Sequence, residues 1–187
     1  GSDVSLRVKA GLAMVPEDRQ AAGLVQTMSV RENVTLSSLG RLSRHGFLSP
    51  REESRSARPL VERLRVKTPS LDAPVTALSG GNQQKVVLAR GVMSRPKVLL
   101  VDEPTRGVDV GAKGEIIDSL RRLAAEGMGI VFATADLAEI QSAATRVLVM
   151  ARGRLTADLP VPKATADALA SAASSTPPGD GRHHARR

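Results

Sequence analysis

The stretch from Leu78 to Asp109, LSGGNQQKVVLARGVMSRPKVLLVDEPTRGVD, constrains the fold of this chain more than any other. A Gly-Gly turn is followed by a helical pattern over 82–93. A continuous apolar run over 98–101 then ends directly at an Asp-Glu pair. A helix that feeds a strand of four apolar residues without alternation indicates a parallel α/β sheet covered on both faces.

Composition excludes several classes of function. The 187 residues are enough for one domain with a substantial core. Two Phe and no Tyr or Trp argue against recognition of nucleic acids by base stacking. The absence of cysteine rules out disulfides and thiolate nucleophiles. No apolar run approaches the roughly 18 residues that a membrane span needs, so a soluble chain is expected.

The net charge of +8 is unevenly distributed. Between Arg41 and Lys67 there are eight basic residues against three glutamates, and the tail from Thr176 holds three arginines against one aspartate. A solvated basic helix face and a disordered end explain this pattern. A nucleic-acid surface is the alternative.

The region before the central stretch reads as a strand followed by a helical unit. Leu12–Val15 is a short apolar run, ended by the charged loop Pro16–Arg19. Two Ser-x-x-Glu capping boxes, Ser29–Glu32 and Ser49–Glu52, predict helix starts, the second with proline at the first helical position. Residues 29–67 therefore form a predicted helical unit, bounded by proline-rich turns.

The region after residue 97 alternates between strand and helix patterns. Such alternation implies right-handed crossovers and a parallel sheet, with a hairpin at the end. An Ala-rich helix from about Lys163 is expected to fade into a disordered tail, in which His183 and His184 are expected to be inert. The predicted elements are strands 98–101, 130–133 and 147–150, a helix over 112–126, a short helix capped at Asp136, and a hairpin turn at Arg152-Gly153.

The acidic pair Asp102-Glu103 comes at the carboxyl end of a predicted strand, where open α/β sheets bind their ligands. Four apolar residues followed by Asp-Glu is the Walker B pattern of P-loop nucleotide hydrolases. In that pattern the Asp holds Mg²⁺ and a neighbouring Glu polarises the attacking water. The alternative is that both acids merely mark the end of the strand.

The turn Ser79-Gly80-Gly81 precedes a predicted helix. Glycines permit close approach of a ligand to the backbone, and exposed N–H groups at a helix N-terminus suit a phosphate. Taken alone, Ser-Gly-Gly could be an ordinary turn. The Walker B strand that follows it makes the combination specific.

Together, LSGGNQQK and VLLVDEPTRGVDVGAK resemble the ATP-binding subunits of ABC transporters, in particular the sugar-importer type (ribose, galactose or xylose) with two such domains in one chain. The resemblance covers about residues 11–159. It implies a partial P-loop NTPase (RecA-like) fold, with a parallel sheet core and an α-helical subdomain. The implied divisions are a core strand with a Q-loop-like segment at 1–24, the helical subdomain at 25–95, the α/β core at 96–160, and a C-terminal helix and tail at 161–187.

The resemblance also implies roles for individual residues, with ATP and Mg²⁺ as cofactors. The signature motif would contact the γ-phosphate of an ATP bound to an opposite domain. Walker B would supply the metal ligand and the catalytic carboxylate, and the D-loop, Thr105 to Asp109, would lie at the dimer seam. The implied residues are Ser79, Gly80, Gly81 and Gln83 for the signature, Asp102 for the metal, Glu103 for catalysis and Asp109 for the seam.

Three departures from the family pattern qualify these roles. There is no Gly-Lys dipeptide and hence no phosphate loop, which in the family lies upstream, so the chain is expected to begin after it. Glu17 occupies the position of the Q-loop glutamine, and Ala135 that of the switch histidine. Alanine has no side-chain hydrogen-bonding group. The pattern therefore points to a C-terminal nucleotide-binding half-domain without its Walker A region.

The implied function is the ATP-binding component of a sugar-type ABC importer, an ATPase within the full transporter but inactive as this chain alone. Expected partners are a second nucleotide-binding domain, the transmembrane permease subunits and, indirectly, a periplasmic or surface sugar-binding protein, with no nucleic acid. The expected location is cytoplasmic, at the inner face of the cell membrane. Two alternatives are a degenerate regulatory half-site that stabilises a dimer without turnover, and an ABC-type protein that acts on nucleic acid.

Overall fold

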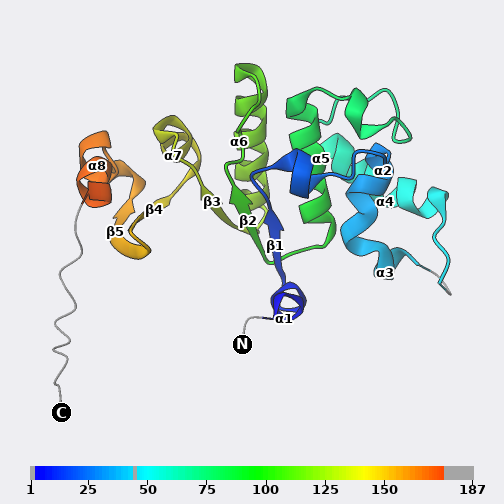
Figure 1. Cartoon of the computed structure of the whole chain (residues 1–187), viewed down its shortest axis with the longest axis horizontal. Helices are drawn as coiled ribbons and strands as arrows, with labels where there is room; N and C mark the ends of the chain where they lie inside the picture. The colour runs from blue at the N-terminus through cyan, green and yellow to red at the C-terminus, as the bar shows by residue number, and fades with distance from the viewer. Residues whose placement is uncertain (1–2, 44–45, 175–187) are drawn as a thin grey trace, which may run out of the picture. The chain divides into compact units, whose positions relative to one another are not determined.

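The computed structural model describes residues 3–43 and 46–174, which divide into two compact units between Ala135 and Asp136 (Figure 1). The first unit carries the whole central stretch and is mixed α/β. In chain order it contains α1 (Val4–Lys9), β1 (Leu12–Val15), the π-helical turn η1 (Arg19–Gly23), α2 (Val30–Thr35), η2 (Leu36–Ser38), α3 (Leu39–Leu42), α4 (Pro50–Arg63), η3 (Val75–Ala77), α5 (Gly80–Met93), β2 (Val98–Asp102), α6 (Val110–Ala125) and β3 (Gly129–Ala133).

The sheet of the first unit is parallel, as its sequence pattern predicts. Its order is β1-β2-β3, with Leu12 opposite Val98 and Val98 opposite Gly129. Helix α5 packs closely on one face, because a Cβ added to Gly91 would lie only 3.1 Å from Leu99. The carboxyl ends of β1 and β2 therefore lie side by side, which fixes where the loops after them meet.

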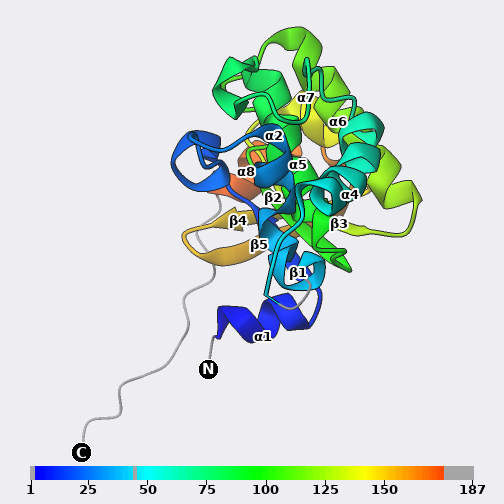
Figure 2. The same ribbon diagram turned by 90° about the vertical axis from the view of Figure 1, so that its right-hand side faces the viewer.

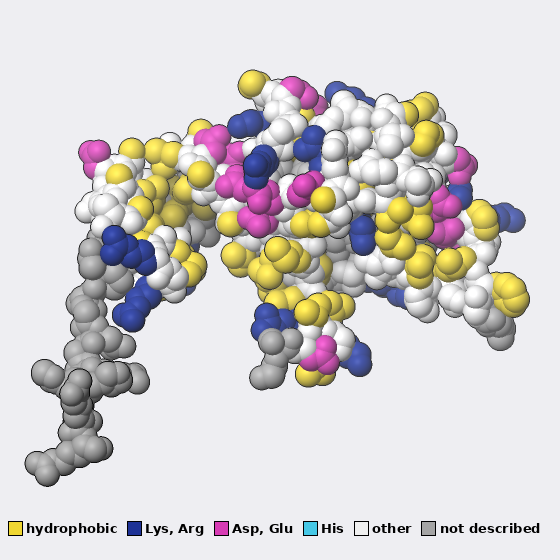
Figure 3. Space-filling model, viewed as in Figure 1, with side chains coloured by type: hydrophobic (Ala, Val, Ile, Leu, Met, Phe, Trp, Pro, Cys, Tyr) yellow, Lys and Arg dark blue, Asp and Glu magenta, His cyan; other side chains and the backbone are white. Residues whose placement is uncertain are grey.

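The opposite face of this sheet is open within the unit, so the expectation of a strand covered on both faces is wrong here. Met14 is 62% exposed and Val131 is 56% exposed, whereas Leu99 and Val101 on the packed face are buried. Figure 3 shows hydrophobic side chains gathered over this part of the surface. An unbroken apolar run predicts a strand, but coverage of each face depends on what packs there.

Helix α5 is the centre of the first unit. It contacts α2 and α4 on one side and α6 and β1 on others, and these helices lie together in both views of the ribbon (Figures 1 and 2). The carbonyl groups near its C-terminus accept hydrogen bonds from Ser37 Oγ, Ser38 Oγ and an Arg41 Nη. These bonds satisfy carbonyls that a helix end otherwise leaves without partners. The helix begins at Gly80 rather than at the predicted Asn82.

An ion pair joins α5 to α6. Lys85 is 1% exposed, and its ammonium group contacts the Glu115 carboxylate and donates to the Arg65 carbonyl at 3.0 Å. The Lys67 ammonium also lies 3.5 Å from Glu115. A buried ammonium group requires such partners.

Only one of the two predicted capping boxes forms. The Ser29 side chain accepts from the Glu32 backbone N–H, and the Glu32 carboxylate accepts from the Ser29 backbone N–H. Ser49 makes no capping hydrogen bond, although Pro50 does begin α4 as predicted. The box at Ser49 is therefore a wrong prediction.

The second unit holds α7 (Leu137–Ala143), β4 (Arg146–Ala151), β5 (Arg154–Pro160), η4 (Val161–Lys163) and α8 (Ala166–Ser174). The Asp136 side chain caps α7, and the hairpin of β4 and β5 turns at Arg152-Gly153, both as predicted. The strand predicted at 147–150 pairs antiparallel with β5 and is not part of the parallel sheet. The tail predicted to be disordered, with His183 and His184, lies outside the described residues.

Candidate functional site

Three segments of the first unit meet at the carboxyl edge of the sheet. They are the residues after β1, the loop 103–109 after β2, and the N-terminus of α5. Arg19 links all three, because its guanidinium donates to the Arg106 and Gly107 carbonyls and lies beside Gly80. The residues that the sequence singles out around positions 17, 79–83 and 102–109 are therefore neighbours in space.

The acidic pair lies where β2 ends. Asp102 is the last residue of β2 and half-buried, and Glu103 follows it with a left-handed φ of 42°. Glu103 donates its backbone N–H to the Ala133 carbonyl, and its Oε1 accepts from the Ala135 N–H at 3.2 Å. A non-glycine residue in this region of φ is uncommon and often marks a functional site. The backbone of Ala135 thus orients the Glu103 carboxylate.

The start of α5 presents a serine and uncapped backbone N–H groups. Ser79 is the N-cap residue but makes no side-chain capping bond, and its exposed Oγ accepts from Asn82 Nδ2 at 3.0 Å. The Gln83 side chain lies inside the unit, where its Nε2 donates to the Val75 carbonyl. At this end of the helix Ser79 is therefore exposed and Gly80 half-exposed, whereas Gly81 and Gln83 are buried.

Other parts of the chain lie close beside the two glycines of the turn. A Cβ at Gly80 would lie 2.8 Å from Arg19 Nη2, and one at Gly81 would lie 2.4 Å from Ala112 Cβ. The sequence led us to expect that these glycines make room for a ligand. In the folded unit, the space beside each is occupied by the chain's own side chains.

The loop 103–109 ends by capping α6. Asp109 Oδ1 accepts from the Ala112 N–H at 2.9 Å, and Thr105 is 3% exposed. Gly107 has a φ of +65°, a conformation that favours glycine. Asp109 therefore lies at the start of α6, next to the start of α5.

Two residues of this cluster have roles that the sequence did not reveal. The Glu17 carboxylate forms an ion pair with the Arg106 guanidinium, and Arg19 forms the carbonyl contacts described above. The only local signal was that charged residues follow β1 directly. Partners nearly ninety positions away along the chain could not be assigned from that pattern.

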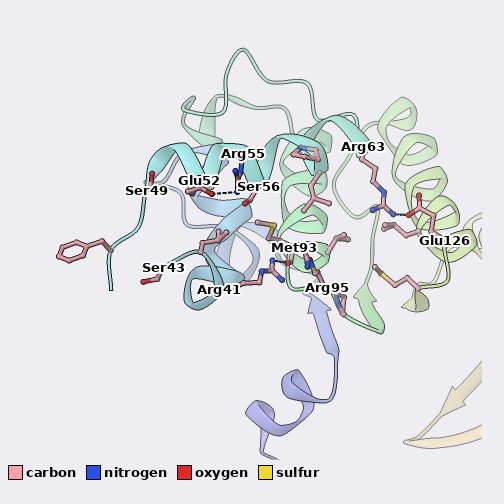
Figure 4. A pocket seen from close by; sticks show the side chains of 18 residues that line it. Arg41, Ser43, Ser49, Glu52, Arg55, Ser56, Arg63, Met93, Arg95 and Glu126 are labelled. Atoms are coloured by element: carbon pink, nitrogen blue, oxygen red, sulfur yellow. Dashed lines mark hydrogen bonds and ion pairs between the residues drawn. The ribbon is translucent and has the colours of Figure 1, made fainter. Parts of the chain in front are cut away.

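A groove of the first unit lies elsewhere, between α4 and the C-terminal ends of α5 and α6 (Figure 4). It has a volume of about 1240 Å³ and is lined by Arg41, Arg55, Arg63 and Arg95, with Glu52 and Glu126. Both glutamates pair with arginines, Glu52 with Arg55 and Glu126 with Arg63. Both carboxylates among the described lining residues are thus paired with arginines, which is not the arrangement of a hydrolytic centre.

The residues present at the carboxyl edge fit part of a nucleotide site. Uncapped N–H groups at the N-terminus of a 14-residue helix, with a serine hydroxyl beside them, suit a phosphate. Mg²⁺ in nucleotide sites uses one or two carboxylates, together with phosphate oxygens and water. Asp102 can supply such a ligand, and the described residues contain no cluster of three or more His, Cys, Asp or Glu that could hold a metal alone.

Comparison with known protein families decides the assignment. The model of the family described as "ABC transporter" matches residues 3–106, which is more than half of the chain. The chain belongs to this family. The resemblance drawn from the residues LSGGNQQK and VLLVDEP is thereby confirmed.

Curated relatives of this ABC transporter domain are sugar-import ATP-binding proteins. A ribose import ATP-binding protein of Rhodopirellula baltica is 45% identical over 166 residues, which cover 89% of this chain and 32% of the relative. A xylose import ATP-binding protein of Pseudomonas syringae pv. tomato is 45% identical over 170 residues, covering 91% of this chain and 32% of the relative. The chain spans about a third of the length of these relatives.

Solved structures confirm the ABC cassette fold. A dimeric ATP-binding cassette in a post-hydrolysis state, bound to ADP and Pi, superimposes with a TM-score of 0.70 at 21% identity, covering 86% of this chain and 68% of that one. An inward-facing metal-chelate type ABC transporter gives a TM-score of 0.74 at 21% identity, covering 87% of this chain and 63% of that one. Among the described residues of this ABC transporter domain, no helix is both long and apolar enough to span a bilayer.

Proposed function

We propose that this chain is the C-terminal nucleotide-binding half-domain of a sugar-importing ABC transporter. Within the whole complex it takes part in ATP hydrolysis that drives transport. The main support for the proposal is that the α5 N-terminus and the loop 103–109 lie together on one edge of the unit. The Arg19 guanidinium lies between them and contacts both. This edge combines an anion-binding helix end with two strand-end carboxylates.

The α5 N-terminus is the part of the chain that binds phosphate. Ser79 Oγ and the N–H groups of Gly80 and Gly81 are hydrogen-bond donors that a helix dipole makes favourable for anions. The sequence has no Gly-Lys phosphate loop of its own. In the proposed assembly these donors serve an ATP held by a second nucleotide-binding domain, with Asp109 at the seam between the two.

The strand-end acids perform the remaining chemistry. Asp102 would hold Mg²⁺, which neutralises phosphate charge when bound. Glu103 accepts the proton of the attacking water, and the Ala135 N–H keeps its carboxylate in place. Gln83 supports α5 through its bond to Val75 and does not reach outward.

The partners follow from the same assignment. The helical subdomain at 25–95 faces the transmembrane permease subunits, and the exposed Phe47 and Leu48 on that subdomain support a contact role. A sugar-binding protein on the other side of the membrane acts only through the permease. The domain works at the cytoplasmic face of the membrane.

A nucleotide-dependent association experiment tests the proposal. A second nucleotide-binding domain with an intact phosphate loop is mixed with this chain, and sedimentation is measured with and without Mg-ATP. We expect association only with Mg-ATP and its loss in Ser79→Arg, whereas Ser70→Arg, at another exposed serine, has no effect. Association that ignores nucleotide would contradict the proposal, as would micromolar Mg-ATP binding to this chain alone by calorimetry.

A regulatory half-site without turnover is the second candidate. Two observations favour it, namely the engagement of Glu17 by Arg106 and the absence of a side-chain donor at Ala135. Turnover in the assembled transporter distinguishes the two candidates, because a regulatory half-site does not need the Glu103 carboxylate.

A further inference from the structure

Three polar links join the segment after β1 to the loop after β2. The Glu17 carboxylate pairs with the Arg106 guanidinium. Arg19 Nη1 donates to the Arg106 carbonyl at 3.0 Å, and its Nη2 donates to the Gly107 carbonyl at 3.1 Å. The two strands are hydrogen-bonded neighbours, so these links join two loops at the same edge of the sheet.

The guanidinium of Arg19 occupies a slot that two glycines leave open. An added Cβ at Gly80 would lie 2.8 Å from its Nη2, and one at Gly107 would lie 3.4 Å from its Nη1. Arg19 Nε is buried and has no hydrogen-bond partner. The two carbonyl contacts and the slot hold this side chain in place, although its unsatisfied Nε costs stability.

The Glu17–Arg106 pair is too exposed to matter much for stability. The Glu17 side chain is 39% exposed and the Arg106 side chain 66% exposed, and ion pairs of this kind contribute little to unfolding free energy. The ion pair instead helps to position the loop after β2. It adds a contact through the Arg106 side chain to the two contacts that Arg19 makes with backbone carbonyls of the same loop. A glutamine at position 17 could still touch Arg106 but would lack the charge that strengthens the contact.

We propose that Glu17 and Arg19 form a clamp that positions the loop 103–109 against the N-terminus of α5. The clamp sets the placement of Glu103 and Asp109 relative to Ser79. The functional part of this inference rests on the proposed role of those residues in a composite ATP site. Glu17 and Arg19 are positioning residues, and Glu17 uses its carboxylate on Arg106.

Hydrogen exchange of the 187-residue chain tests the clamp without nucleotide. We expect Glu17→Gln and Arg106→Gln each to raise amide exchange over 105–109 by about two- to fivefold, the range that a surface ion pair supports. The charge swap Glu17→Arg with Arg106→Glu should restore the original rate. Glu62→Gln and Arg58→Gln, at exposed positions of α4, are matched controls that leave the loop unchanged.

The carbonyl contacts of Arg19 are tested by Arg19→Lys, which keeps the charge but cannot reproduce the planar fork. We expect faster exchange at 105–109, because the fork donates to carbonyls of this loop. Exchange that is unchanged in every clamp variant, or a charge swap that fails to restore it, overturns the proposal. These outcomes do not depend on nucleotide, so they are distinct from a failure of the association test.

A kinetic measurement separates positioning from simple support of the fold. In the assembled transporter, Glu17→Gln should lower kcat for ATP hydrolysis about two- to fivefold with KM unchanged, and the charge swap should recover it. A rise in KM with unchanged kcat overturns the inference, because it would place Glu17 in nucleotide binding.

Discussion

Glu103 Oε1 accepts a hydrogen bond from the backbone N–H of Ala135 at 3.2 Å. The carboxylate that follows β2 is therefore held by the backbone just after β3. The family resemblance predicts a histidine side chain at position 135. In this chain only the backbone provides a donor there, and Glu103 takes it. The strained φ of Glu103 and this contact together give the carboxylate one direction.

Replacing Glu103 by glutamine removes the proton acceptor and keeps the shape of the side chain. We expect ATP turnover in the assembled transporter to fall about 100-fold or more, the range for loss of a general base. Nucleotide-dependent association should be retained. Glu62→Gln is the control. Unchanged turnover in Glu103→Gln would favour the regulatory half-site.

The ion pair between Lys85 and Glu115 predicts an asymmetric response to mutation. Glu115→Gln leaves the buried Lys85 ammonium without its carboxylate and should cost about 1–3 kcal/mol of unfolding free energy. Lys85→Met combined with Glu115→Gln should be less destabilising than Glu115→Gln alone, because no buried charge then remains. Urea unfolding of the wild type, the single variant and the double variant measures this. A double variant less stable than the single one contradicts the interpretation.

The same pair predicts a pH dependence. The hydrogen bond and charge of Lys85 lower the pKa of Glu115 below its ordinary value of 4.5. A carboxyl whose pKa is lower in the folded state contributes stability above its unfolded pKa and loses it as the pH falls through the folded pKa. The stability difference between the wild type and Glu115→Gln should therefore be constant near pH 7 and shrink below about pH 4.5. Urea midpoints at pH 7, 5 and 4 test this, and a difference that grows on acidification would contradict it.

The sequence pattern predicted those features that depend on neighbouring residues. The apolar run 98–101 predicted β2, and the Asp-Glu pair after it predicted carboxylates at the edge of the sheet. The two glycines at 80 and 81 predicted a helix start. Each of these signals is carried by local periodicity or by turn chemistry.

Features that depend on distant packing were not accessible from the sequence. The contacts of Arg19 with the loop after β2 join positions far apart in the chain, and no local pattern encodes them. The exposed face of β3 was also not predictable. Val131 lies in an apolar run that indicates a strand, but the run does not show whether another element packs on that face. The hairpin of β4 and β5 was predicted, but the absence of β4 from the parallel sheet was not, because strand and helix alternation alone does not specify which strands pair.

The two capping boxes give a direct comparison between a formed and an unformed motif. Ser29→Ala should cost about 1 kcal/mol of unfolding free energy, because it removes a side-chain bond to the Glu32 N–H. Ser49→Ala should change stability by no more than a few tenths of a kcal/mol, since Ser49 makes no capping bond. Thermal and urea unfolding of both variants measure the difference. Equal effects of the two substitutions would contradict this prediction.

Gly81 tests whether the signature glycine serves packing as well as any ligand. Alanine is ordinarily a better helix former than glycine, by about 1 kcal/mol. At Gly81, however, the added Cβ would lie 2.4 Å from Ala112 Cβ, so Gly81→Ala should destabilise the chain by about 1–3 kcal/mol in the absence of nucleotide. Gly114→Ala, in α6 with nothing within 4 Å of its added Cβ, is the control and should stabilise.

The combination of Gly81→Ala with Ala112→Gly provides the decisive measurement. Removing the Ala112 methyl group opens the space that the new Cβ needs, so the double variant should be more stable than Gly81→Ala alone, even though glycine is the poorer helix former at position 112. If Gly81 were glycine only to let a phosphate approach, Gly81→Ala would stabilise the nucleotide-free chain, as Gly114→Ala should, and the second substitution would only destabilise. Urea unfolding of the three variants without nucleotide therefore separates a packing role, which acts in the chain by itself, from a binding role, which appears only when ATP is present.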